Sequence, residues 1–494
     1  MPDDAISISF DQIPLSIRVP GAYVEIDPSQ ANQGLYSLPT SIVVIGQVLA
    51  GAPIPLLTPT PVTRTDQIVS LCGDGSMLAQ MGTAVLAGSQ SALPVTLIAV
   101  ADNAAGAFAT GTATVGGVAT SAGTLALYIG GRLVDVGVNA GDSAASVAGN
   151  IVSAIAATAD MPVTAAAAGA VVTCTARHRG VCGNAIDLRA NYNAGDATPA
   201  GLTLTFAAMA GGTGNPLIAP ALTVIGDHWY TDYVCPYTDP INLAALAAQL
   251  GANYGPLIMR DGTGWCAVPG SWSAAMTLGQ SLNSPQLSIL ALQGAPSLAW
   301  EWAAVTAGVA AYYLSIDPAR PLQTLPLPGL LAPAIADRWL WSERNQALYS
   351  GISTYRVGSG NLPVIERCIT TYQKTAFGGT DPSYLDIETL RTLALLRFDL
   401  QNYITVTLPR FKLGDDGTNF GRGQNVVTPS VIRGLMVARA AQWETQGLIE
   451  DLDQFKAGLL VARNPNDPNR IDALVPPNII NQLRVTAVKM QFLL

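Results

Sequence analysis

Histidine side chains are frequent general bases, and this chain has two, His178 and His228. His228 follows Asp227 in the run Asp-His-Trp-Tyr, so the carboxylate could orient the imidazole as a base. No Gly-x-Ser-x-Gly elbow supplies a nucleophile for such a base. We therefore interpret His228 as a turn histidine. An α/β enzyme with a site around Asp227, His228 and Asp239 stays as an alternative.

Two other groupings contain residue types that bind metal ions. Cys174, His178 and Cys182 are soft ligands, but a zinc site needs a fourth ligand, and the flanking arginines would repel a cation. The run Asp-Asp-Gly-Thr-Asn at 415–419 offers oxygen ligands, but the final Glu of a calcium-binding EF-hand loop is missing. We interpret the first grouping as a strand end with its loop, and the second as an exposed turn.

The run Gly211-Gly212-Thr213-Gly214 is the best candidate for a phosphate loop. A P-loop requires a Lys after its last Gly, and the first Lys of this chain is Lys374. No helix pattern follows the run to present amide groups to a phosphate. We interpret the run as a domain hinge. The sequence therefore predicts no catalytic residue, no metal ligand and no cofactor, and a chain that is not an enzyme.

The composition indicates a surface that other protein subunits cover. The chain is 49% hydrophobic and 12% charged, with a mean hydropathy of +0.33, whereas soluble domains carry about 25% charged residues. A membrane-spanning helix needs about 20 apolar residues, and the best candidate, residues 302–314, is shorter. The acidic, polar start has no signal-peptide pattern. We therefore predict burial between subunits and no membrane insertion.

The net charge of −9 argues against a direct nucleic-acid partner. The charge is uneven, because residues 1–330 carry 8 basic and 19 acidic side chains, whereas residues 331–494 carry 17 and 15. The two parts are therefore expected to face different environments. Six cysteines in 494 residues form no disulfide framework, which fits assembly in a reducing cytoplasm.

Hydrophobic periodicity and composition predict an α+β multidomain chain built around an α/β layer. We predict a middle α/β domain, an inserted Ala/Gly-rich α+β domain, a C-terminal domain and two extended terminal arms. The middle domain comprises residues 22–88 and 216–330, and the inserted domain comprises residues 89–215. The C-terminal domain comprises residues 331–475, and the two arms comprise residues 1–21 and 476–494.

The expected elements follow from the same periodicity. Strands are predicted at residues 41–48, 95–100, 124–129, 134–138, 171–176, 202–207, 222–226, 233–235, 265–268, 287–292, 364–372 and 458–463. Helices are predicted at residues 76–86, 143–157, 240–250, 297–313, 333–343, 384–403 and 429–446. Asp142 or Ser143, Asp239 and Thr428 are the predicted N-caps of the helices at 143–157, 240–250 and 429–446. Gly251 is predicted to end the helix at 240–250.

Both terminal segments alternate apolar and polar residues with the period of a β-strand, the first with a break at Ile13-Pro14 and the last with a one-residue register change at Ala487-Val488. The apolar positions are Ile6, Ile8, Phe10, Leu15, Ile17 and Val19 in the first segment, and Leu483, Val485, Val488, Met490 and Phe492 in the last. Neither segment has a hairpin mate, and an unpaired strand edge invites aggregation. We predict that each segment adds to a sheet of a neighbouring subunit, while pairing within its own subunit stays open. Pro20-Gly21 and Pro476-Pro477 are candidate hinges.

Several segments are similar to one known family. The run from Phe10 to Asp27, with Ile13-Pro14-Leu15-Ser16-Ile17-Arg18-Val19-Pro20-Gly21 at its centre, resembles the start of Mu-like contractile phage tail sheath proteins. Four further runs are similar to that family: GGTGNP at 211–216, VCPYTD at 234–239, TTYQ at 370–373 and VPP at 475–477. The resemblance covers nearly the whole chain and is weakest in residues 89–215.

The resemblance implies a structural subunit that forms stacked six-membered rings around a tail tube. The C-terminal domain would be the inner domain, the inserted domain would lie outside, and the arms would join neighbouring subunits. The sheath would contract and drive the tube through the host envelope for genome delivery. Implied partners are further sheath subunits, the tail tube protein, and the baseplate and tail terminator proteins. The implied location is the virion tail, assembled in the host cytoplasm.

A contact between sheath and tube must be weak enough to release, and exposed charge pairs contribute only about 0–1 kcal/mol each. Arg391, Arg397, Arg433 and Arg439 are candidate tube contacts, although arginines so placed on a helix also fit a solvated face. A second hypothesis stays open. It is a surface or capsid-decorating binding protein that uses the inserted domain as its ligand module.

Overall fold

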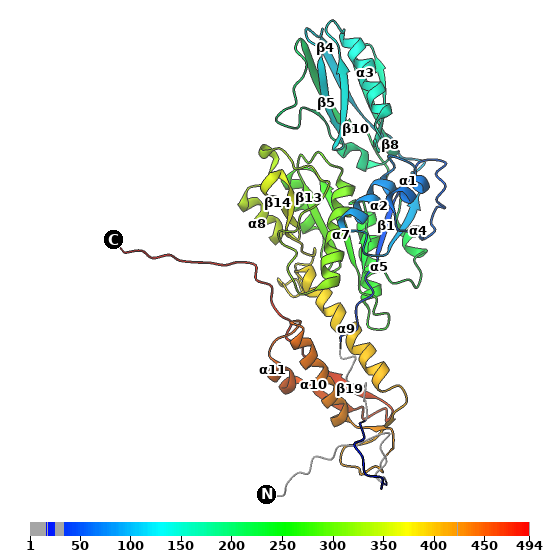
Figure 1. Cartoon of the computed structure of the whole chain (residues 1–494), viewed down its shortest axis with the longest axis vertical. Helices are drawn as coiled ribbons and strands as arrows, with labels where there is room; N and C mark the ends of the chain where they lie inside the picture. The colour runs from blue at the N-terminus through cyan, green and yellow to red at the C-terminus, as the bar shows by residue number, and fades with distance from the viewer. Residues whose placement is uncertain (1–15, 17, 25–33, 422, 494) are drawn as a thin grey trace.

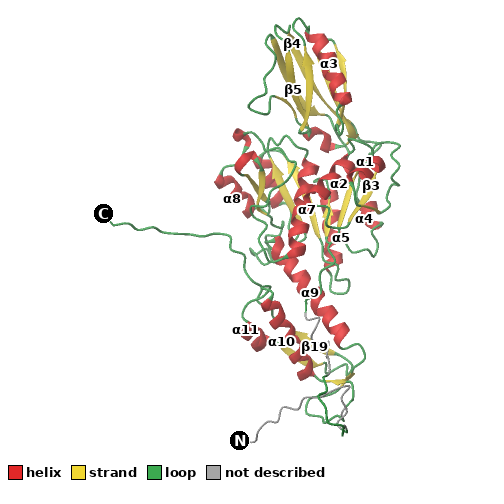
Figure 2. Cartoon of the chain, viewed as in Figure 1, coloured by secondary structure: helices red, strands yellow, loops and turns green. Residues whose placement is uncertain are grey.

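The computed structural model describes residues 16, 18–24, 34–421 and 423–493. The molecule is elongated, and an inserted unit (residues 107–213), a central body and a C-terminal unit (residues 395–480) follow one another along its long axis (Figure 1). A tail (residues 485–493) leaves the body without forming helix or strand (Figure 2).

The central body is built on a six-stranded sheet in the order β13-β12-β11-β1-β3-β2. All neighbours pair in parallel except β2, which runs antiparallel to β3. The β1, β3 and β13 strands are buried along their whole length, so both faces of the sheet are covered. The five strands predicted in these regions are confirmed. Their bounds are β1 (Ile42–Gln47), β3 (Val95–Val100), β11 (Asp232–Val234), β12 (Thr263–Pro269) and β13 (Leu287–Leu292), beside the unforeseen β2 (Thr60–Val62).

Helices cover both faces of this sheet. They are α1 (Thr65–Cys72), α2 (Met77–Gly88), α4 (Ala219–Thr223), α5 (Pro240–Tyr254), α6 (Trp272–Gln280) and α7 (Ala299–Ile316). The strand order runs in opposite directions from β1, so right-handed crossovers place α2 and α5 on opposite faces. α2 and α7 cross closely, since a Cβ on Gly88 would lie 2.7 Å from the Val305 carbonyl oxygen. None of the helices in the described residues is long and apolar enough to cross a membrane.

The start of α5 follows the predicted cap, but its end does not follow the predicted stop. Asp239 accepts a hydrogen bond of 3.1 Å from the Asn242 amide, as an N-cap should. Gly251 does not end the helix, which continues to Tyr254. Asn253 in this extra turn is buried and donates to a tyrosine hydroxyl of β11, so tertiary packing outweighs the cost of a glycine inside the helix.

The inserted unit holds two small sheets, β10-β4-β8-β7 and β6-β5-β9, with α3 packed beside them (Figure 1). Ser143 caps α3 by accepting from the Ser146 amide at 3.2 Å, as predicted. Strand β3, expected inside the inserted domain, pairs along its whole length with β1. Strand pairing therefore places the division after β3 and not at residue 89. The bounds are β4 (Phe108–Gly117), β5 (Gly123–Ile129), β6 (Arg132–Val138), α3 (Ala144–Ala157), β7 (Val163–Ala168), β8 (Val171–Arg179), β9 (Leu188–Ala190) and β10 (Leu202–Ala210).

Three predicted elements take a different form. Residues 222–226, predicted as a strand, belong to α4 and the turn after it, where Pro220 suits the first helical turn. The helix predicted at 333–343 starts later, as α8 (Trp341–Tyr349). The strand predicted at 364–372 ends early, as β15 (Pro363–Arg367), and pairs with the unforeseen β14 (Thr354–Val357).

The C-terminal unit has its own apolar core, which includes Leu396, Trp443 and Phe455. Helix α9 (Ile387–Thr407) begins in the core of the central body, where Ile387 is buried, and reaches the second core at Leu396. Packing therefore divides the chain within α9, whereas the sequence predicted a boundary at residue 331. The remaining elements are β16 (Lys412–Leu413), β17 (Val426–Val427), α10 (Pro429–Thr445), α11 (Leu452–Gly458), β18 (Leu460–Arg463) and β19 (Ile471–Leu474).

Candidate assembly interface

The carboxyl ends of β1 and β11 form the switch point of the central sheet, because the strand order reverses there. Open α/β sheets bind ligands at such points. Here the end of β8 closes the crevice. The Gln47 amide nitrogen at the end of β1 donates to Asp102 Oδ1 at 2.7 Å and to the Arg179 carbonyl at 2.8 Å. The remaining space is about 10 Å³, room for at most one water molecule.

His178 is part of this closure. The Met77 amide donates to its Nε2 at 3.1 Å, so the neutral ring carries its proton on Nδ1, which lies 3.0 Å from Asp102 Oδ1. Burial would raise the pKa of Asp102, but hydrogen bonds from His178, the Arg179 amide and Gln47 lower it below its usual value. One ring nitrogen therefore joins the inserted unit to the start of α2, and the other joins it to the segment after β3. Within the described residues, no group of three or more His, Cys, Asp or Glu side chains could hold a metal ion.

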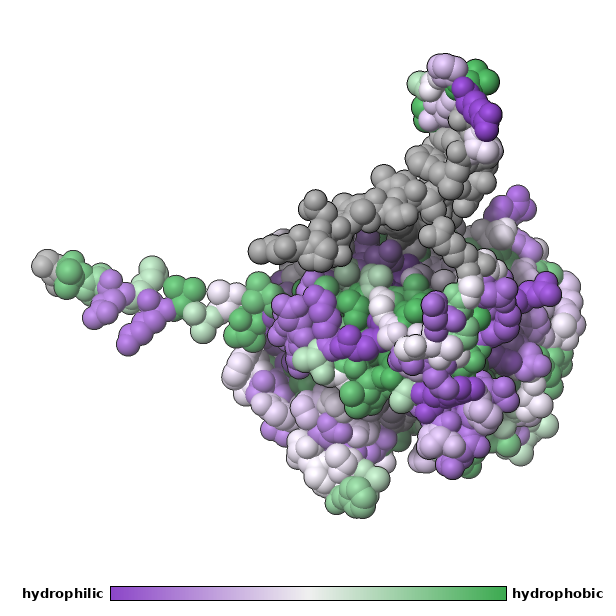
Figure 3. Space-filling model, turned by 90° about the horizontal axis from the view of Figure 1, so that it is seen from below, coloured by the Kyte–Doolittle hydropathy of each residue, from purple (hydrophilic) through white to green (hydrophobic). Residues whose placement is uncertain are grey.

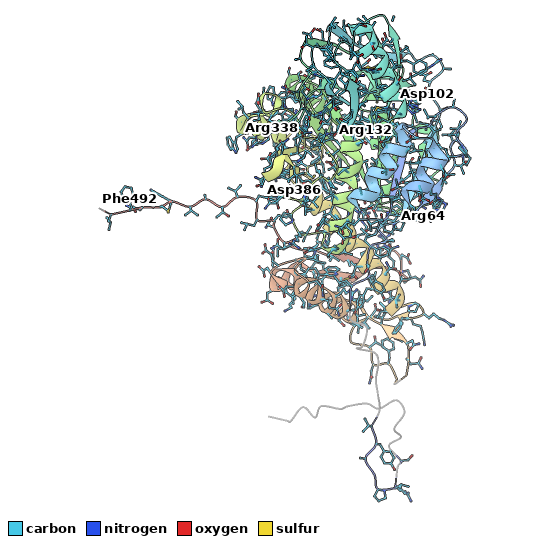
Figure 4. The ribbon with its side chains drawn as sticks, turned by 45° about the horizontal axis from the view of Figure 1, so that its top comes forward. Arg64, Asp102, Arg132, Arg338, Asp386 and Phe492 are labelled. Carbon is cyan, nitrogen blue, oxygen red and sulfur yellow. The ribbon has the colours of Figure 1, made fainter. Side chains whose placement is uncertain are left out.

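A second polar joint connects the inserted unit to α7. Arg132, at the start of β6, donates to Glu301 Oε2 at 2.7 Å and to Asp160 Oδ2 at 3.1 Å. Burial raises the pKa of Glu301, and the adjacent Arg132 guanidinium opposes that rise. Figure 4 shows Asp102 and Arg132 in the region where the two parts meet. The inserted unit is thus held to the central body by polar contacts at two places.

A cavity of about 370 Å³ remains further along the junction, at the ends of β12 and β13. Its lining includes the apolar side chains of Leu188, Phe206 and Leu292. The carboxylate in the lining, Asp187, is paired with Arg189. The cavity brings together no acid–base pair for catalysis.

The residues of the alternative enzyme site do not converge. Asp227 is 99% exposed and bonds to Arg260 at 2.7 Å, and this hydrogen bond lowers its pKa. His228 lies against Tyr230, with ring centroids 6.5 Å apart. Asp239 caps α5 instead. No hydrogen bond joins these carboxylates to His228 in the part of the chain that the structure describes.

The predicted glycine hinge is a tight joint. The chain enters and leaves the inserted unit side by side, where the Ala107 amide donates to the Thr213 carbonyl at 3.0 Å and the reverse bond measures 3.2 Å. A Cβ on Gly212 would lie 2.4 Å from the Gly180 carbonyl oxygen. The glycine therefore permits a close approach of two backbones.

In the predicted exposed turn at 415–419, Asp416 accepts from the Ser430 amide at 3.1 Å.

The segment after the N-terminal arm is fixed to the C-terminal unit. The Tyr36 amide donates to Asp399 Oδ1 at 2.9 Å, and Asp399 is fully buried. Arg439 and the Trp443 indole donate to the same carboxylate. The predicted arm positions Ile6, Ile8, Phe10, Leu15 and Ile17 lie outside the described residues, whereas Val19, Pro20 and Gly21 are exposed.

The four arginines predicted as tube contacts have different environments. Arg391 and Arg439 are 4% and 3% exposed. Arg391 pairs with Asp232 at 2.6 Å, and Arg439 pairs with Asp399. The expectation of a solvated or partner-facing guanidinium is therefore wrong for these two. Each carboxylate partner lies on a different helix or strand from its arginine, distant in sequence. The residue pattern around the arginines therefore could not reveal these pairs. Arg397 is partly buried against Asp261 at 2.9 Å, and Arg433 is exposed.

The tail is held at its root by an ionic cluster. Arg484 Nη2 lies 3.1 Å from Asp386 Oδ1 and 2.8 Å from Glu388 Oε2, and Glu388 is fully buried. Asp386 also accepts two bonds of 2.8 Å from Arg367. Figure 4 labels Asp386 near the place where the tail leaves the body. The candidate hinge Pro476-Pro477 lies before this cluster, so the free part of the tail begins after Arg484.

Beyond Arg484 the apolar side chains of the tail are exposed. Val485, Val488, Met490 and Phe492 are between 78% and 92% exposed. Figure 3 shows apolar and hydrophilic residues following one another along the tail. The predicted strand is not formed within residues 482–493, because nothing in the described part of the chain pairs with it.

A short hairpin in the C-terminal unit offers unpaired strand edges. β18 and β19 form a two-stranded antiparallel sheet with no third strand among the described residues. Val461 and Ile471 pack on the core of the unit, whereas Leu460 and Leu474 are 63% and 61% exposed. An isolated two-stranded hairpin is only marginally stable. The tail is thus a segment without a strand partner, and the hairpin has edges to which a further strand could pair.

The chain is similar over its whole length to proteins of one family. The model of the phage tail sheath protein central domain matches residues 211–371, and that of the phage tail sheath C-terminal domain matches residues 379–493. The Mu-like prophage FluMu tail sheath protein of Haemophilus influenzae is 41% identical over 489 residues, which cover 99% of this chain and 100% of that protein.

Two solved structures are also similar. The sheath tail protein of Desulfitobacterium hafniense has a TM-score of 0.47 at 12% identity, over 93% of this chain and 100% of that chain. The contracted helical sheath of the anti-feeding prophage has a TM-score of 0.49 at 10% identity, over 96% of this chain and 99% of that chain.

Proposed function

The chain belongs to the phage tail sheath protein family, and from this premise we propose how its copies build a sheath. It is a structural subunit of a contractile tail sheath and a component of the virion tail. The family assignment favours this role over a surface or capsid-decorating binding protein. The subunits assemble in the host cytoplasm as stacked hexameric rings around a tail tube, between a baseplate and a tail terminator. The sheath contracts to drive the tube through the host envelope for genome delivery.

The tail joins one subunit to the next by adding a strand. Residues 485–493 alternate apolar and polar side chains apart from a one-residue register change at Ala487-Val488, and they have no strand partner among the described residues. Nine extended residues span about 30 Å, enough to reach a neighbouring subunit. Added strands gain affinity from main-chain hydrogen bonds and specificity from alternate side chains. The exposed tail is the observation that carries this proposal.

The acceptor is the β18–β19 hairpin of a neighbour. A hairpin has two free edges, so one subunit can receive two strands. One strand comes from the tail of a neighbour, and the other comes from the N-terminal arm (residues 1–21) of a different neighbour. Three or four strands with one apolar face are stable where two are marginal. Each subunit is thereby linked to several others.

Contraction then moves whole units about short joints. The joint of the tail lies after Arg484, where the ionic cluster with Asp386 and Glu388 ends. Pro20-Gly21 is exposed and serves as the joint of the N-terminal arm. Repacking that gains each subunit about 2 kcal/mol, the energy of a single hot-spot contact, adds up to a large total over many copies. No fuel is needed if the extended state is metastable.

Arg433 is the arginine best placed to touch the tube. It is exposed on α10, and its Nη2 donates to the Lys456 carbonyl at 2.5 Å, which fixes its side chain. Arg397 contributes through its partly exposed side chain. Such contacts are individually weak, which suits a wall that must slide off the tube.

Electron microscopy of the purified full-length chain tests the role. We expect hollow cylinders after a change of salt or pH that favours association. Monodisperse monomers under every condition would contradict the proposal, since a sheath subunit must polymerise.

A further inference from the structure

A cavity of about 300 Å³ lies between the start of α8 and strand β14 in the central body. Three arginines line it, Arg338, Arg344 and Arg356, together with the aromatic rings of Trp339 and Tyr355. Figure 4 labels Arg338 on this side of the body. Neither the fold nor the proposed strand exchange explains why three guanidinium groups meet here.

The guanidinium groups are only partly neutralised. Arg344 Nε lies 2.9 Å and 3.1 Å from the two oxygens of Glu366, and Arg338 Nε donates to the Pro333 carbonyl at 3.0 Å. Arg356 is exposed and has no hydrogen-bond or ion-pair partner among the described residues. Even if Asp337, which neighbours Arg338, is counted with Glu366, positive charge is in excess.

A buried hydroxyl points to a missing ligand. Thr354 lines the cavity and is 2% exposed, yet its Oγ1 has no hydrogen-bond partner in the described structure. Buried polar groups without partners are rare in native proteins. The β14–β15 ladder is irregular at this point, since Thr354 pairs with Arg367 and Tyr355 with Ile365. Such bulges redirect side chains and are frequent beside functional sites.

The walls of the cavity are fixed in place. Trp339 Nε1 donates to Gln293 Oε1 at 3.1 Å. The Tyr355 ring lies 4.6 Å from that of Trp302, measured between centroids. The site is therefore already formed before any ligand binds.

We propose that this cavity binds an oxyanion, a carboxylate or phosphate group, through Arg338, Arg344 and Arg356, with the Thr354 hydroxyl as an added donor. Guanidinium groups bind both kinds of oxyanion through paired N–H donors. The volume is at the lower end for small-molecule sites, so a compact molecule with several carboxylates fits. The oxyanion comes either from an acidic side chain of a neighbouring subunit or from a free anion in solution. Only the first source rests on the proposed sheath function.

Titration of the full-length, unpolymerised protein with citrate and with inorganic phosphate at low ionic strength tests the site. Calorimetry should show saturable citrate binding that Arg356→Gln weakens about tenfold, because an exposed donor is lost without disturbing the fold. Thr354→Val should weaken it less. Arg64→Gln is the matched control, since Arg64 is a surface arginine 72% exposed and paired with Asp66. Wild-type protein that binds neither anion, or Arg356→Gln protein that binds as tightly as wild type, would overturn the proposal.

The same titration on assembled cylinders identifies the source. If a neighbour's carboxylate fills the cavity, cylinders bind no citrate, and cylinders of the Arg356→Gln variant dissociate at lower salt than wild type. If the ligand is a free anion, cylinders bind citrate as the subunit does. Failure to form cylinders counts against the sheath proposal alone, because the subunit titration still tests the cavity.

Discussion

The switch point of the central sheet and the tail after Arg484 differ in how their bonding groups are satisfied. At the switch point, the side-chain nitrogen of Gln47, both ring nitrogens of His178 and both oxygens of Asp102 have partners, whereas the buried side-chain oxygen of Gln47 has none among the described residues. Along the tail, the apolar side chains are exposed and the backbone joins no sheet within the described residues.

The difference indicates where the molecule acts. An α/β sheet usually binds its ligand at the switch point, and here an inserted unit occupies that place. Bonding capacity remains at the tail and at the edges of the β18–β19 hairpin. The switch point therefore holds a closed joint in place of a ligand site, and in the proposed function the unpaired groups of the tail and the hairpin serve association with further copies.

Deleting residues 485–494 removes the unpaired tail, and of all the changes proposed it should have the largest effect. Polymers should disappear, while the free energy of unfolding changes by less than about 0.5 kcal/mol, because exposed residues are removed. Microscopy and urea unfolding measure the two outcomes. A Thr486→Ser, Gln491→Asn variant, which alters polar positions only, should polymerise normally. Normal cylinders from the truncated chain would show that the tail is dispensable.

Removing the buried carboxylate of Asp399 should destabilise the folded protein and leave the tail free to pair. Asp399→Ala leaves the Arg439 guanidinium buried without its carboxylate, and we expect a loss of about 3–5 kcal/mol in unfolding free energy. Denaturant unfolding of the full chain measures it. Asp415→Ala is the control, because Asp415 is 68% exposed in its pair with Arg463, and it should cost less than about 1 kcal/mol. Equal losses in the two variants would contradict the assigned role of the buried carboxylate.

A substitution in the switch-point joint should have a smaller effect on the free energy of unfolding, and this effect should depend on pH. Asp102→Asn should cost about 1–3 kcal/mol, since a charged hydrogen-bond acceptor is lost. Hydrogen bonds hold the pKa of Asp102 below its unfolded value, near 3.9. The stabilisation by this carboxylate is therefore complete above about pH 4 and is lost as the pH falls through the folded pKa.

Unfolding free energies measured between pH 6 and pH 3 check this prediction. The difference between wild type and Asp102→Asn should shrink towards acid. Asp66→Asn, on an exposed ion pair, serves as the control and should show little difference at any pH. A difference for Asp102→Asn that stays constant with pH would contradict the assigned role.

The smallest effect is expected at the proposed tube contact. Arg433→Gln should leave polymerisation intact and weaken co-sedimentation of the sheath with its tube several-fold, more strongly at low salt than at high salt. Arg470→Gln, a change at a 63% exposed surface arginine, is the control. Unchanged co-sedimentation at low salt would remove Arg433 from the tube-facing surface.

Sequence reasoning located most of the central body because buried parallel strands are continuous apolar runs. Residues 287–292, LSILAL, need no partner to be recognised. The cap at Asp239 was equally readable, since its chemistry is local. The predictions that failed concern contacts between residues that are distant in sequence. Nothing near Arg391 indicates that Asp232 will neutralise it, and nothing in the composition of residues 95–100 shows that they pair with β1.

The site was foreseen only in part. Alternation marked the apolar positions of the tail, but the pattern could not show that Arg484 fixes the root or that β18 and β19 leave two edges free. The joint at His178 could have been suspected from its histidine among arginines at the end of a strand. Its partners, the Met77 amide and Asp102, were not readable from the sequence.

A reconstruction of the assembled cylinder by electron cryomicroscopy would reveal whether the tail pairs with a neighbouring subunit. It should show residues 485–493 hydrogen-bonded as a strand along a free edge of the β18–β19 hairpin of a neighbouring subunit. A tail folded onto its own subunit, or neighbours joined elsewhere with the hairpin still two-stranded, would contradict the account.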